Sequence, residues 1–130
     1  MLKIDAHQHF WIYDEVRDSW ISTDMAVLRA DFMPRQLLPE LQRNHFDGCV
    51  VVQSDQSQVE NLFQLKNAEA HDFVKGVVGW VDLRSDDIED QLSALSAYGK
   101  LKGFRHILQG ESDRALLLKP EFLNGISKLK

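Results

Sequence analysis

Two histidines near the start of the chain have the spacing of a metal or oxyanion site. His7 and His9 end an apolar stretch that predicts a strand over residues 3–7. Successive side chains on a strand point to opposite faces, so His7, His9 and Asp5 are expected to share one face. Positions 2, 4 and 6 would then form an apolar packing face. Two imidazoles so placed can bind one metal ion or one anionic oxygen. We therefore expect a buried first strand with a chemical site at its C-terminal tip.

Further residues with chemical potential end the other predicted strands. Apolar segments predict strands at residues 49–53, 76–81 and 103–107. Their ends carry, in chain order, Gln53, Trp80 with Asp82, and Arg105 with His106. Parallel strands bring such ends together at one edge of the sheet. This set suits hydrolysis of an ester-like or amide-like bond, in which a cation polarises a carbonyl and an imidazole or carboxylate activates water.

Each of these residues also has a purely structural interpretation. Asp82 follows a strand and is well placed to cap the next helix. Trp80 is of a type that commonly packs in a core. Arg105 and His106 are adjacent, so strand alternation prevents both from facing one side unless the strand has already ended.

Helical patterns separate the predicted strands. They cover residues 34–45, 57–71, 85–98 and 114–128, and the second has its apolar positions at 59, 62, 63, 65 and 70. The resulting β-α alternation predicts parallel strands joined by right-handed crossovers. The first crossover contains a long excursion, residues 10–33, whose aromatic residues include Trp11, Tyr13, Trp20 and Phe32. Such an excursion is either a lid over the strand tips or a packed surface loop.

Composition limits the classes of function. The 130 residues are sufficient for one domain, residues 1–130, with a real core. The net charge of −5 argues against a nucleic-acid partner. No apolar stretch approaches the roughly 20 residues of a membrane span. We therefore expect a cytoplasmic protein without a membrane partner. The single cysteine, Cys49, lies in an apolar run and is expected to be buried.

Five segments, spread in order over nearly the whole chain, resemble the amidohydrolase-related sugar lactonases. This family includes the L-fuconolactone and L-rhamnonolactone hydrolases. The matching segments are IDAHQHFW (4–11), LRADF (28–32), VVVQ (50–53), VVGWVDL (77–83) and KGFRH (102–106).

The resemblance implies an α/β fold, a (β/α)8 TIM barrel of the amidohydrolase type, and hydrolysis of a sugar lactone to its acid. His7 and His9 would be metal ligands or hydrogen-bond donors to the lactone. Arg105 and His106 would bind or polarise the substrate. Four residues would line the pocket: Trp11, Gln53, Trp80 and Asp82. The implied cofactor is one divalent metal ion, zinc first, although some relatives work without a metal.

The chain departs from this family in length. A (β/α)8 barrel typically needs about 250 residues, and this chain accounts for about the first four βα units. The family residue expected to activate water belongs to a later strand. Three explanations stay open: an incomplete product, part of a longer chain, or a homo-oligomer that closes a barrel from two halves. Two alternative functions also stay open, namely an amidohydrolase-type decarboxylase or amide hydrolase, and a non-catalytic fragment or half-barrel that works only by association.

Overall fold

The computed structural model describes residues 1–129 and contains four strands and four α-helices in alternation. The elements are β1 (Ile4–Gln8), η1 (Thr23–Leu28), α1 (Pro34–Arg43), β2 (Gly48–Val52), α2 (Gln58–Ala70), β3 (Val74–Gly79), α3 (Ile88–Leu95), β4 (Leu101–Phe104), η2 (Leu116–Leu118) and α4 (Pro120–Ser127). The strands form one sheet in the order β1-β2-β3-β4 with every pairing parallel. The β-α alternation predicted from the sequence is confirmed.

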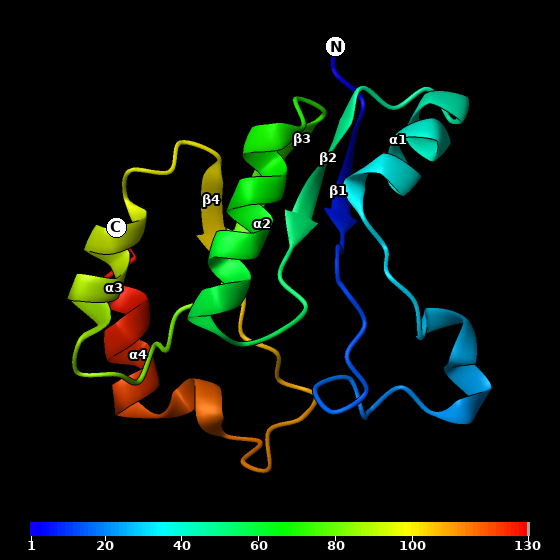
Figure 1. The fold of residues 1–130 in the computed structure, drawn as a ribbon. Helices are drawn as coiled ribbons and strands as arrows, with labels where there is room; N and C mark the ends of the chain where they lie inside the picture. Colours follow the sequence, from blue (N-terminus) through cyan, green and yellow to red (C-terminus); the bar gives the residue numbers. More distant parts are fainter. Residues whose placement is uncertain (130) are drawn as a thin grey trace.

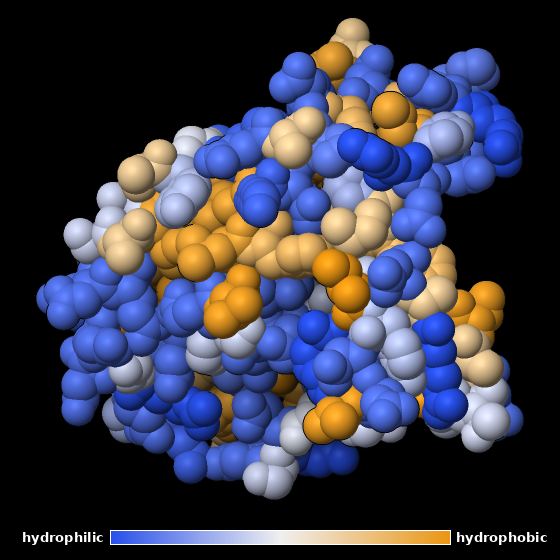
Figure 2. Space-filling model, viewed as in Figure 1, coloured by the Kyte–Doolittle hydropathy of each residue, from blue (hydrophilic) through white to orange (hydrophobic). Residues whose placement is uncertain are grey.

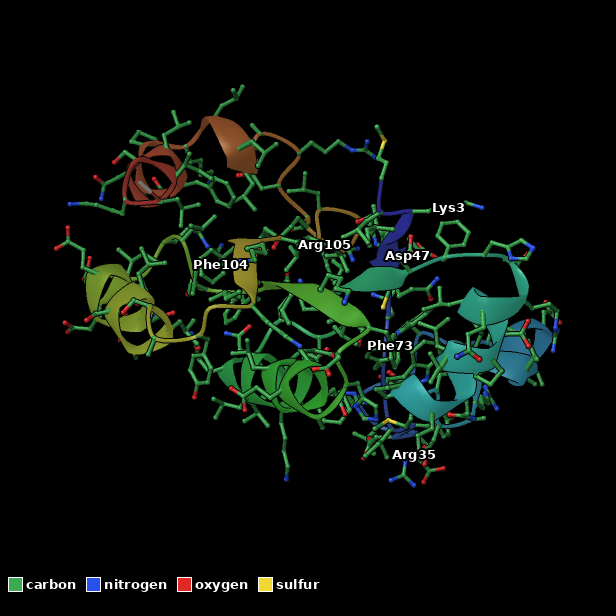
Figure 3. The ribbon with its side chains drawn as sticks, turned by 90° about the horizontal axis from the view of Figure 1, so that it is seen from above. Lys3, Arg35, Asp47, Phe73, Phe104 and Arg105 are labelled. Carbon is green, nitrogen blue, oxygen red and sulfur yellow. The ribbon has the colours of Figure 1, made fainter. Side chains whose placement is uncertain are left out.

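All four strands end at the same side of the molecule. Figure 1 shows the arrows pointing in one direction, with the 10–33 excursion and the connection from β4 to α4 running past their tips. The helices α1, α2 and α3 lie along one face of the sheet, and α4 lies beyond the edge strand β4, next to α3 (Figures 1 and 3). The core lies between this face and the helices, and includes Cys49, Val51, Leu65, Val77 and Leu95.

The helices α1 and α2 begin within one residue of their predicted starts, α3 begins later, at Ile88, and all four α-helices are shorter than expected. Pro34 opens α1, as suits a residue that lacks a backbone N–H. The helix ends at Arg43, and His45 follows in the left-handed region with φ of 59°. The last predicted helix divides into η2 and α4, because Pro120 starts a new helix. Within residues 1–129, no helix has the length and apolar composition needed to cross a membrane.

The apolar face expected for α2 is wrong in part, since of its five positions Leu65 is buried and Phe63 packs against the core, but the others are exposed. Val59 and Leu62 are 75% and 54% exposed. The buried positions follow helical spacing and are largely polar: Glu60, Asn61, Gln64, Leu65 and Ala68. The first turns of α2 lie beside the loops that leave the strands, where buried backbone groups need hydrogen-bond partners.

The face expected for Asp5 is also wrong, because β1 contains a bulge. Asp5 pairs with Cys49 and Gln8 pairs with Val51, so β1 advances three residues while β2 advances two. Paired residues of parallel strands point to the same side, which places Asp5 with Gln8 on the core-facing side. The Gln8 side-chain amide donates to the Asp5 carboxylate over 2.5 Å.

The first strand is less buried than its sequence predicts. Ala6 and His7 are exposed, and the other three residues of β1 are only half-buried. In the part of the chain that the structure describes, β1 is an edge strand whose sole strand partner is β2. One flank therefore stays open to solvent.

Candidate functional site

His7 and His9 face one another at the tip of β1. Their Nε2 atoms are 3.2 Å apart. The Nδ1 of His9 lies 2.9 Å from the backbone carbonyl oxygen of Val52. A carbonyl oxygen only accepts, so Nδ1 carries the hydrogen and the Nε2 of the neutral ring keeps its lone pair. The fold of β1 beside β2 thus selects the tautomer of His9 that can accept a proton or bind a cation.

The surroundings of His9 favour the neutral ring. Burial lowers the pKa of His9 most, and the positive charges of His7 and Arg105 lower it further. The hydrogen bond to Val52 and the negative charge of Glu60 oppose this shift. His9 is therefore neutral at ordinary pH. The charged groups that act on its pKa, namely His7, Arg105 and Glu60, lie around its ring.

The histidine pair fits part of a metal site. Two Zn–N bonds of about 2.0–2.1 Å at a tetrahedral angle separate their nitrogens by about 3.4 Å, close to the observed 3.2 Å. Among residues 1–129, however, no group of three or more His, Cys, Asp or Glu side chains is arranged to hold a metal ion. A catalytic zinc commonly has three protein ligands, so the histidine pair alone would be an incomplete ligand set.

Arg105 is held over the sheet by a reciprocal contact with Gln53. The Arg105 Nη1 donates to the Gln53 carbonyl oxygen over 3.3 Å, and the Gln53 side-chain amide donates to the Arg105 carbonyl oxygen over 3.0 Å. The Arg105 backbone N–H also donates to Gly79 of β3. Figure 3 shows Arg105 on the side of the sheet away from α2. Gln53, predicted to line the pocket, is fully buried and positions Arg105.

His106 points to different partners from its neighbour Arg105. Its Nε2 lies 2.6 Å from a carboxylate oxygen of Glu111, and its side chain is only 6% exposed. Its ring packs edge-to-face on Phe122 of α4, with centroids 5.5 Å apart. The two side chains diverge although β4 has already ended at Phe104, and His106 links the segment after β4 to α4. Its predicted catalytic role stays a prediction.

Trp80 and Asp82 follow β3 and are both fixed by local contacts. Asn61 holds the backbone of Trp80, accepting from its N–H over 2.8 Å and donating to its carbonyl over 2.6 Å. The Trp80 ring is half-buried, and its indole nitrogen has no partner among the described residues. Asp82 accepts from the Arg84 backbone over 3.1 Å and lies 3.6 Å from its guanidinium. It forms a turn, whereas Asp87 occupies the N-cap position of α3.

Trp11 anchors the 10–33 excursion. Its backbone forms an antiparallel bridge with Phe32, and the two rings are 4.5 Å apart. Its indole N–H donates to the Leu28 carbonyl over 3.4 Å. Phe10 and Ile21 are each 2% exposed within the same segment. The base of the excursion is thus a closed, packed loop anchored by Trp11 and Phe32, whereas Trp20 near its middle is 64% exposed.

A buried polar network on α2 joins the ends of β1 and β2, and sequence reasoning missed it. One carboxylate oxygen of Glu60 accepts from the Ser54 N–H, the Ser54 hydroxyl and the Gln64 amide, over 3.0, 3.1 and 2.9 Å. The same Gln64 amide donates to the Phe10 carbonyl over 2.7 Å. Phe10 follows His9 directly, so Glu60 and Gln64 fix the exit of β1. The sequence did contain a signal for this network: Glu60, Asn61 and Gln64 lie at helical spacing from the buried Leu65, so they share its face of α2.

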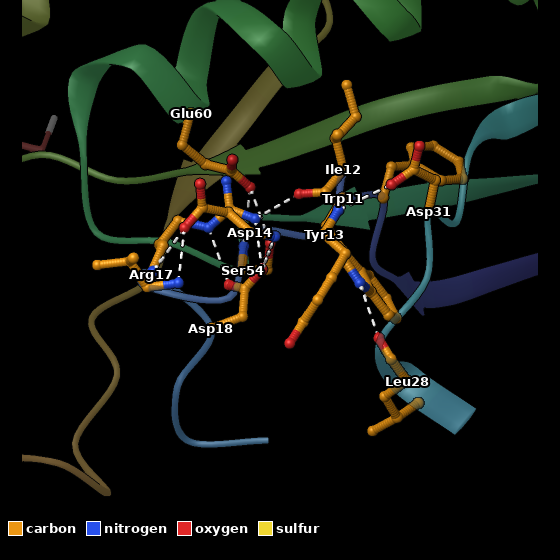
Figure 4. A network of polar contacts seen from close by, with 12 residues as sticks. Trp11, Ile12, Tyr13, Asp14, Arg17, Asp18, Leu28, Asp31, Ser54 and Glu60 are labelled. Carbon is orange, nitrogen blue, oxygen red and sulfur yellow. Dashed lines mark hydrogen bonds and ion pairs between the residues drawn. The ribbon is translucent and has the colours of Figure 1, made fainter. Parts of the chain in front are cut away.

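An ion pair from the excursion lies beside this network. Figure 4 shows Arg17 and Asp18 next to Ser54 and Glu60. Arg17 binds both oxygens of Asp18, through Nε over 2.8 Å and Nη2 over 2.6 Å. Its guanidinium holds the pKa of Asp18 below the usual range, and the negative charges of Asp55 and Glu60 add to the rise in the pKa of Arg17. Both partners belong to the excursion, and Arg17 also donates to the Ile12 carbonyl, so the ion pair orders this segment itself.

Comparison with known proteins identifies close sequence relatives. No protein-family model matches the chain. An L-fucono-1,5-lactonase of Burkholderia multivorans (strain ATCC 17616 / 249) is 35% identical over 130 residues, which cover 99% of this chain and 44% of the relative. An L-fucono-1,5-lactonase of Burkholderia ambifaria is 38% identical over 111 residues, covering 85% and 38% respectively. The chain thus spans less than half the length of the curated relatives it matches.

Solved structures match the same portion. A crystal structure of an amidohydrolase from Burkholderia multivorans with bound zinc has a TM-score of 0.93 and 35% identity, over 98% of this chain and 45% of that one. A probable 2-pyrone-4,6-dicarboxylic acid hydrolase from Acinetobacter baumannii, with citric acid bound, has a TM-score of 0.71 at 20% identity, over 98% and 45%. The second match concerns the fold alone.

Proposed function

We propose, from the premise that the chain belongs to the amidohydrolase family of sugar lactonases, that it forms the carbonyl-binding part of a sugar-lactone hydrolase. Its four parallel βα units are part of a (β/α)8 barrel and match 45% of an amidohydrolase chain. The substrate class follows from relatives that are L-fucono-1,5-lactonases. The small molecule we assign to this chain is therefore a sugar lactone such as L-fucono-1,5-lactone.

One observation carries the proposal: His7, His9 and Arg105 gather at the strand tips. The two imidazoles are in contact, and the charge of Arg105 acts on His9 directly. Attack of water on a lactone places negative charge on the carbonyl oxygen. Oriented donors or cations around that oxygen stabilise the charge more in the transition state than in the substrate. The Arg105 guanidinium meets this requirement directly, and the two imidazoles would meet it through a cation held by their Nε2 atoms.

His7 and His9 would hold the divalent metal ion that the family implies. When bound there, the ion supplies Lewis acidity toward the lactone carbonyl. The chain's own residues do the rest of the binding. His9 presents its Nε2 because Val52 fixes its tautomer, and Arg105 is oriented by Gln53. Trp80 and Trp11 carry the apolar surface near the sugar ring in this proposal, and His106 keeps the segment after Arg105 in place through Glu111.

The water-activating group is assigned to the remainder of the barrel. Asp82 is the carboxylate that follows β3, and its Oδ1 is engaged by both the backbone and the guanidinium of Arg84. Glu60 is 7% exposed, and one of its oxygens already accepts three hydrogen bonds. Both carboxylates are therefore committed to holding loops. The chain accordingly supplies substrate binding and carbonyl polarisation.

The test separates binding from turnover. L-fucono-1,5-lactone and its stable opened acid would be titrated into the chain while the His7, His9 and Arg105 side-chain NMR signals are followed. Lactone opening would be measured in parallel by pH-stat, with and without Zn²⁺. We expect saturable shifts at these three residues. Binding should weaken at least about ten-fold in His9→Ala and Arg105→Leu, since each change removes a polar partner of the ligand.

Two matched variants act as controls. His45→Ala removes an imidazole that follows α1, and Arg114→Leu removes a guanidinium from the exposed segment before η2. Both should bind as the parent chain does. Equal weakening in all four variants, or no saturable shift with either ligand, would contradict the proposal. A ligand panel that contains a cyclic amide and a carboxylated acid shows whether the lactone is preferred over these substrates.

A further inference from the structure

We propose that two buried amide side chains of α2, those of Gln64 and Asn61, are positioning residues for the site. Gln64 fixes the chain directly after His9, and Asn61 fixes Trp80. These roles deepen the proposed function and rest on it for their ligands. The contacts that carry them all lie within the described residues, between α2 and the exits of β1 and β3.

The two amides lie on the buried side of α2. Both side chains are fully buried, whereas the apolar Val59 and Leu62 of the same helix are exposed. Figure 2 shows hydrophobic side chains among the hydrophilic ones on the side of the molecule that carries α2. The helix therefore turns polar groups inward, the reverse of the usual amphipathic arrangement. Buried amides cost free energy unless they are hydrogen-bonded, so their partners show what they hold.

The Gln64 side chain anchors the chain just beyond the end of β1. Its Nε2 donates to the Phe10 carbonyl oxygen over 2.7 Å and to the Glu60 carboxylate over 2.9 Å. Both partners are acceptors, so they determine which end of the amide faces them. His9 follows β1 directly and precedes this anchor. In this proposal the anchor keeps the His9 ring where its Nδ1 meets the Val52 carbonyl oxygen, at 2.9 Å.

Asn61 holds the backbone of Trp80 at two points. Its Oδ1 accepts from the Trp80 N–H over 2.8 Å, and its Nδ2 donates to the Trp80 carbonyl oxygen over 2.6 Å. Hydrogen bonds on both sides of one residue hold its backbone as a neighbouring strand would, and so set the direction in which its side chain leaves. Gly79 makes this close approach possible, because a Cβ placed on it would lie 2.5 Å from the Asn61 Oδ1.

The places that the two amides hold distinguish positioning from the mere satisfaction of buried backbone groups. A contribution to stability alone would be the same at any loop of the sheet. Gln64 instead holds the residue next to a proposed metal ligand, and Asn61 holds a residue of the proposed lactone pocket. Small displacements of binding groups weaken binding strongly, and contacts behind a metal-binding histidine tune its affinity. Each amide should therefore control its own site residue and leave the other unchanged.

Two nearly isosteric variants test this separation in the chain without ligand, and each is the matched control of the other. Gln64→Met and Asn61→Leu keep the approximate volume of the side chain and remove its hydrogen bonds. NMR at about pH 8, where an ordinary imidazole is neutral, measures the nitrogen chemical shifts of the His9 ring and the solvent exchange of the Trp80 indole N–H. In Gln64→Met, the His9 nitrogens should move toward the average of the two tautomers, with Trp80 exchange as in the parent chain. In Asn61→Leu, Trp80 exchange should accelerate at least about ten-fold, the scale of one lost buried hydrogen bond, and His9 should not change.

Ligand binding gives the functional readout. Gln64→Met should weaken Zn²⁺ binding at least about ten-fold in competition with a chromophoric chelator, and Asn61→Leu should leave it unchanged. Asn61→Leu should instead weaken the binding of L-fucono-1,5-lactone. A parent chain that binds neither Zn²⁺ nor the lactone would contradict the proposed function. The His9 and Trp80 signals of the unliganded variants would still decide between positioning and stability alone.

Two further variants cover the case in which a buried substitution prevents folding. Gly79→Ala retains the Asn61 amide but displaces its oxygen, so it should accelerate Trp80 exchange and leave the His9 signals unmoved. His9→Ala leaves α2 intact, and it should shift the Gln64 side-chain amide signals but not those of Asn61, since coupling between two residues acts in both directions. Disturbance of both site residues by Gln64→Met and by Asn61→Leu alike would overturn the proposal. So would His9 and Trp80 signals that stay unchanged in both variants.

Discussion

The Nδ1–H of His9 binds the carbonyl oxygen of Val52 over 2.9 Å, across the β1–β2 junction. This contact makes the binding properties of His9 depend on the pairing of β1 with β2, because it fixes which ring nitrogen carries the hydrogen and which faces His7. A hydrogen bond from one ring nitrogen to a carbonyl is the usual support of a histidine that binds metal through the other. The strand pairing of β1 thereby decides what His9 can bind.

The first prediction concerns zinc. We expect the chain to bind one Zn²⁺ per site through His7 and His9, weakly, because two protein ligands are fewer than a catalytic zinc commonly has. His9→Ala should weaken binding at least about ten-fold, the scale seen for loss of even a supporting contact. Competition with a chromophoric chelator measures the affinity. His71→Ala, on a histidine that caps the end of α2, is the control; equal loss in both variants would refute His9 as a ligand.

The second prediction concerns Glu60 and the titration of His9. The charge of Glu60 raises the pKa of His9 against the stronger lowering by burial. Glu60→Gln keeps an acceptor oxygen for Ser54 and Gln64 but removes the charge, so the pKa of His9 should fall further. An NMR titration of the His9 ring resonances measures the change. Glu111→Gln removes a carboxylate that contacts His106 instead, and a similar change of His9 in that variant would contradict a direct effect.

The polar face of α2 marks the limit of what the sequence could predict. The alternation of elements, the parallel order and the tip positions of His9, Gln53 and Arg105 follow from apolar runs and strand chemistry. The burial of Asn61 and Gln64 depends instead on backbone groups of Trp80 and Phe10, which are distant in sequence. The resemblance to lactonases was confirmed by the relatives and by an amidohydrolase fold match.

The bulge in β1 shows a second limit. Period-two alternation placed Asp5 with His7, but one extra residue in the strand moves Asp5 to the core-facing side. The position of a bulge depends on the register against β2, which no pattern within residues 1–10 determines. The exposure of β1 could not be predicted for the same reason, since whether Ala6 is covered depends on which strands flank β1.

The third prediction concerns stability as a function of pH. The pKa of His9 lies below its ordinary value of 6.5 in the folded chain. As pH falls below 6.5, His9 of the unfolded chain therefore takes up a proton before His9 of the folded chain does. The free energy of unfolding decreases until the pH has passed the lower pKa of the folded chain. The slope from this one group cannot exceed about 1.4 kcal/mol per pH unit. Above pH 7 the effect vanishes because both states are neutral.

Urea unfolding from pH 5 to 8, at one protein concentration, measures this slope. His9→Gln removes the group, so its unfolding free energy should be flatter than that of the parent chain over this range. The Asp18 carboxylate does not interfere, since its lowered pKa affects stability only below its ordinary value of 3.8. An identical slope in both proteins would show that His9 titrates alike in the folded and unfolded chain.

The fourth prediction concerns the close approach of α4 to the turn after β3. A Cβ placed on Gly125 would lie 1.9 Å from the Leu83 carbonyl oxygen, a backbone atom that cannot move without moving the turn. Gly125→Ala gains up to about 1 kcal/mol of helix propensity, but overpacking typically costs about 1–3 kcal/mol and here involves backbone. We expect a net loss of about 1–3 kcal/mol in the unfolding free energy, measured by urea denaturation. At Gly110, no described atom lies within 4 Å of the added Cβ, so Gly110→Ala should leave stability within about 0.5 kcal/mol. A neutral Gly125→Ala would mean that α4 does not dock on Leu83 in solution.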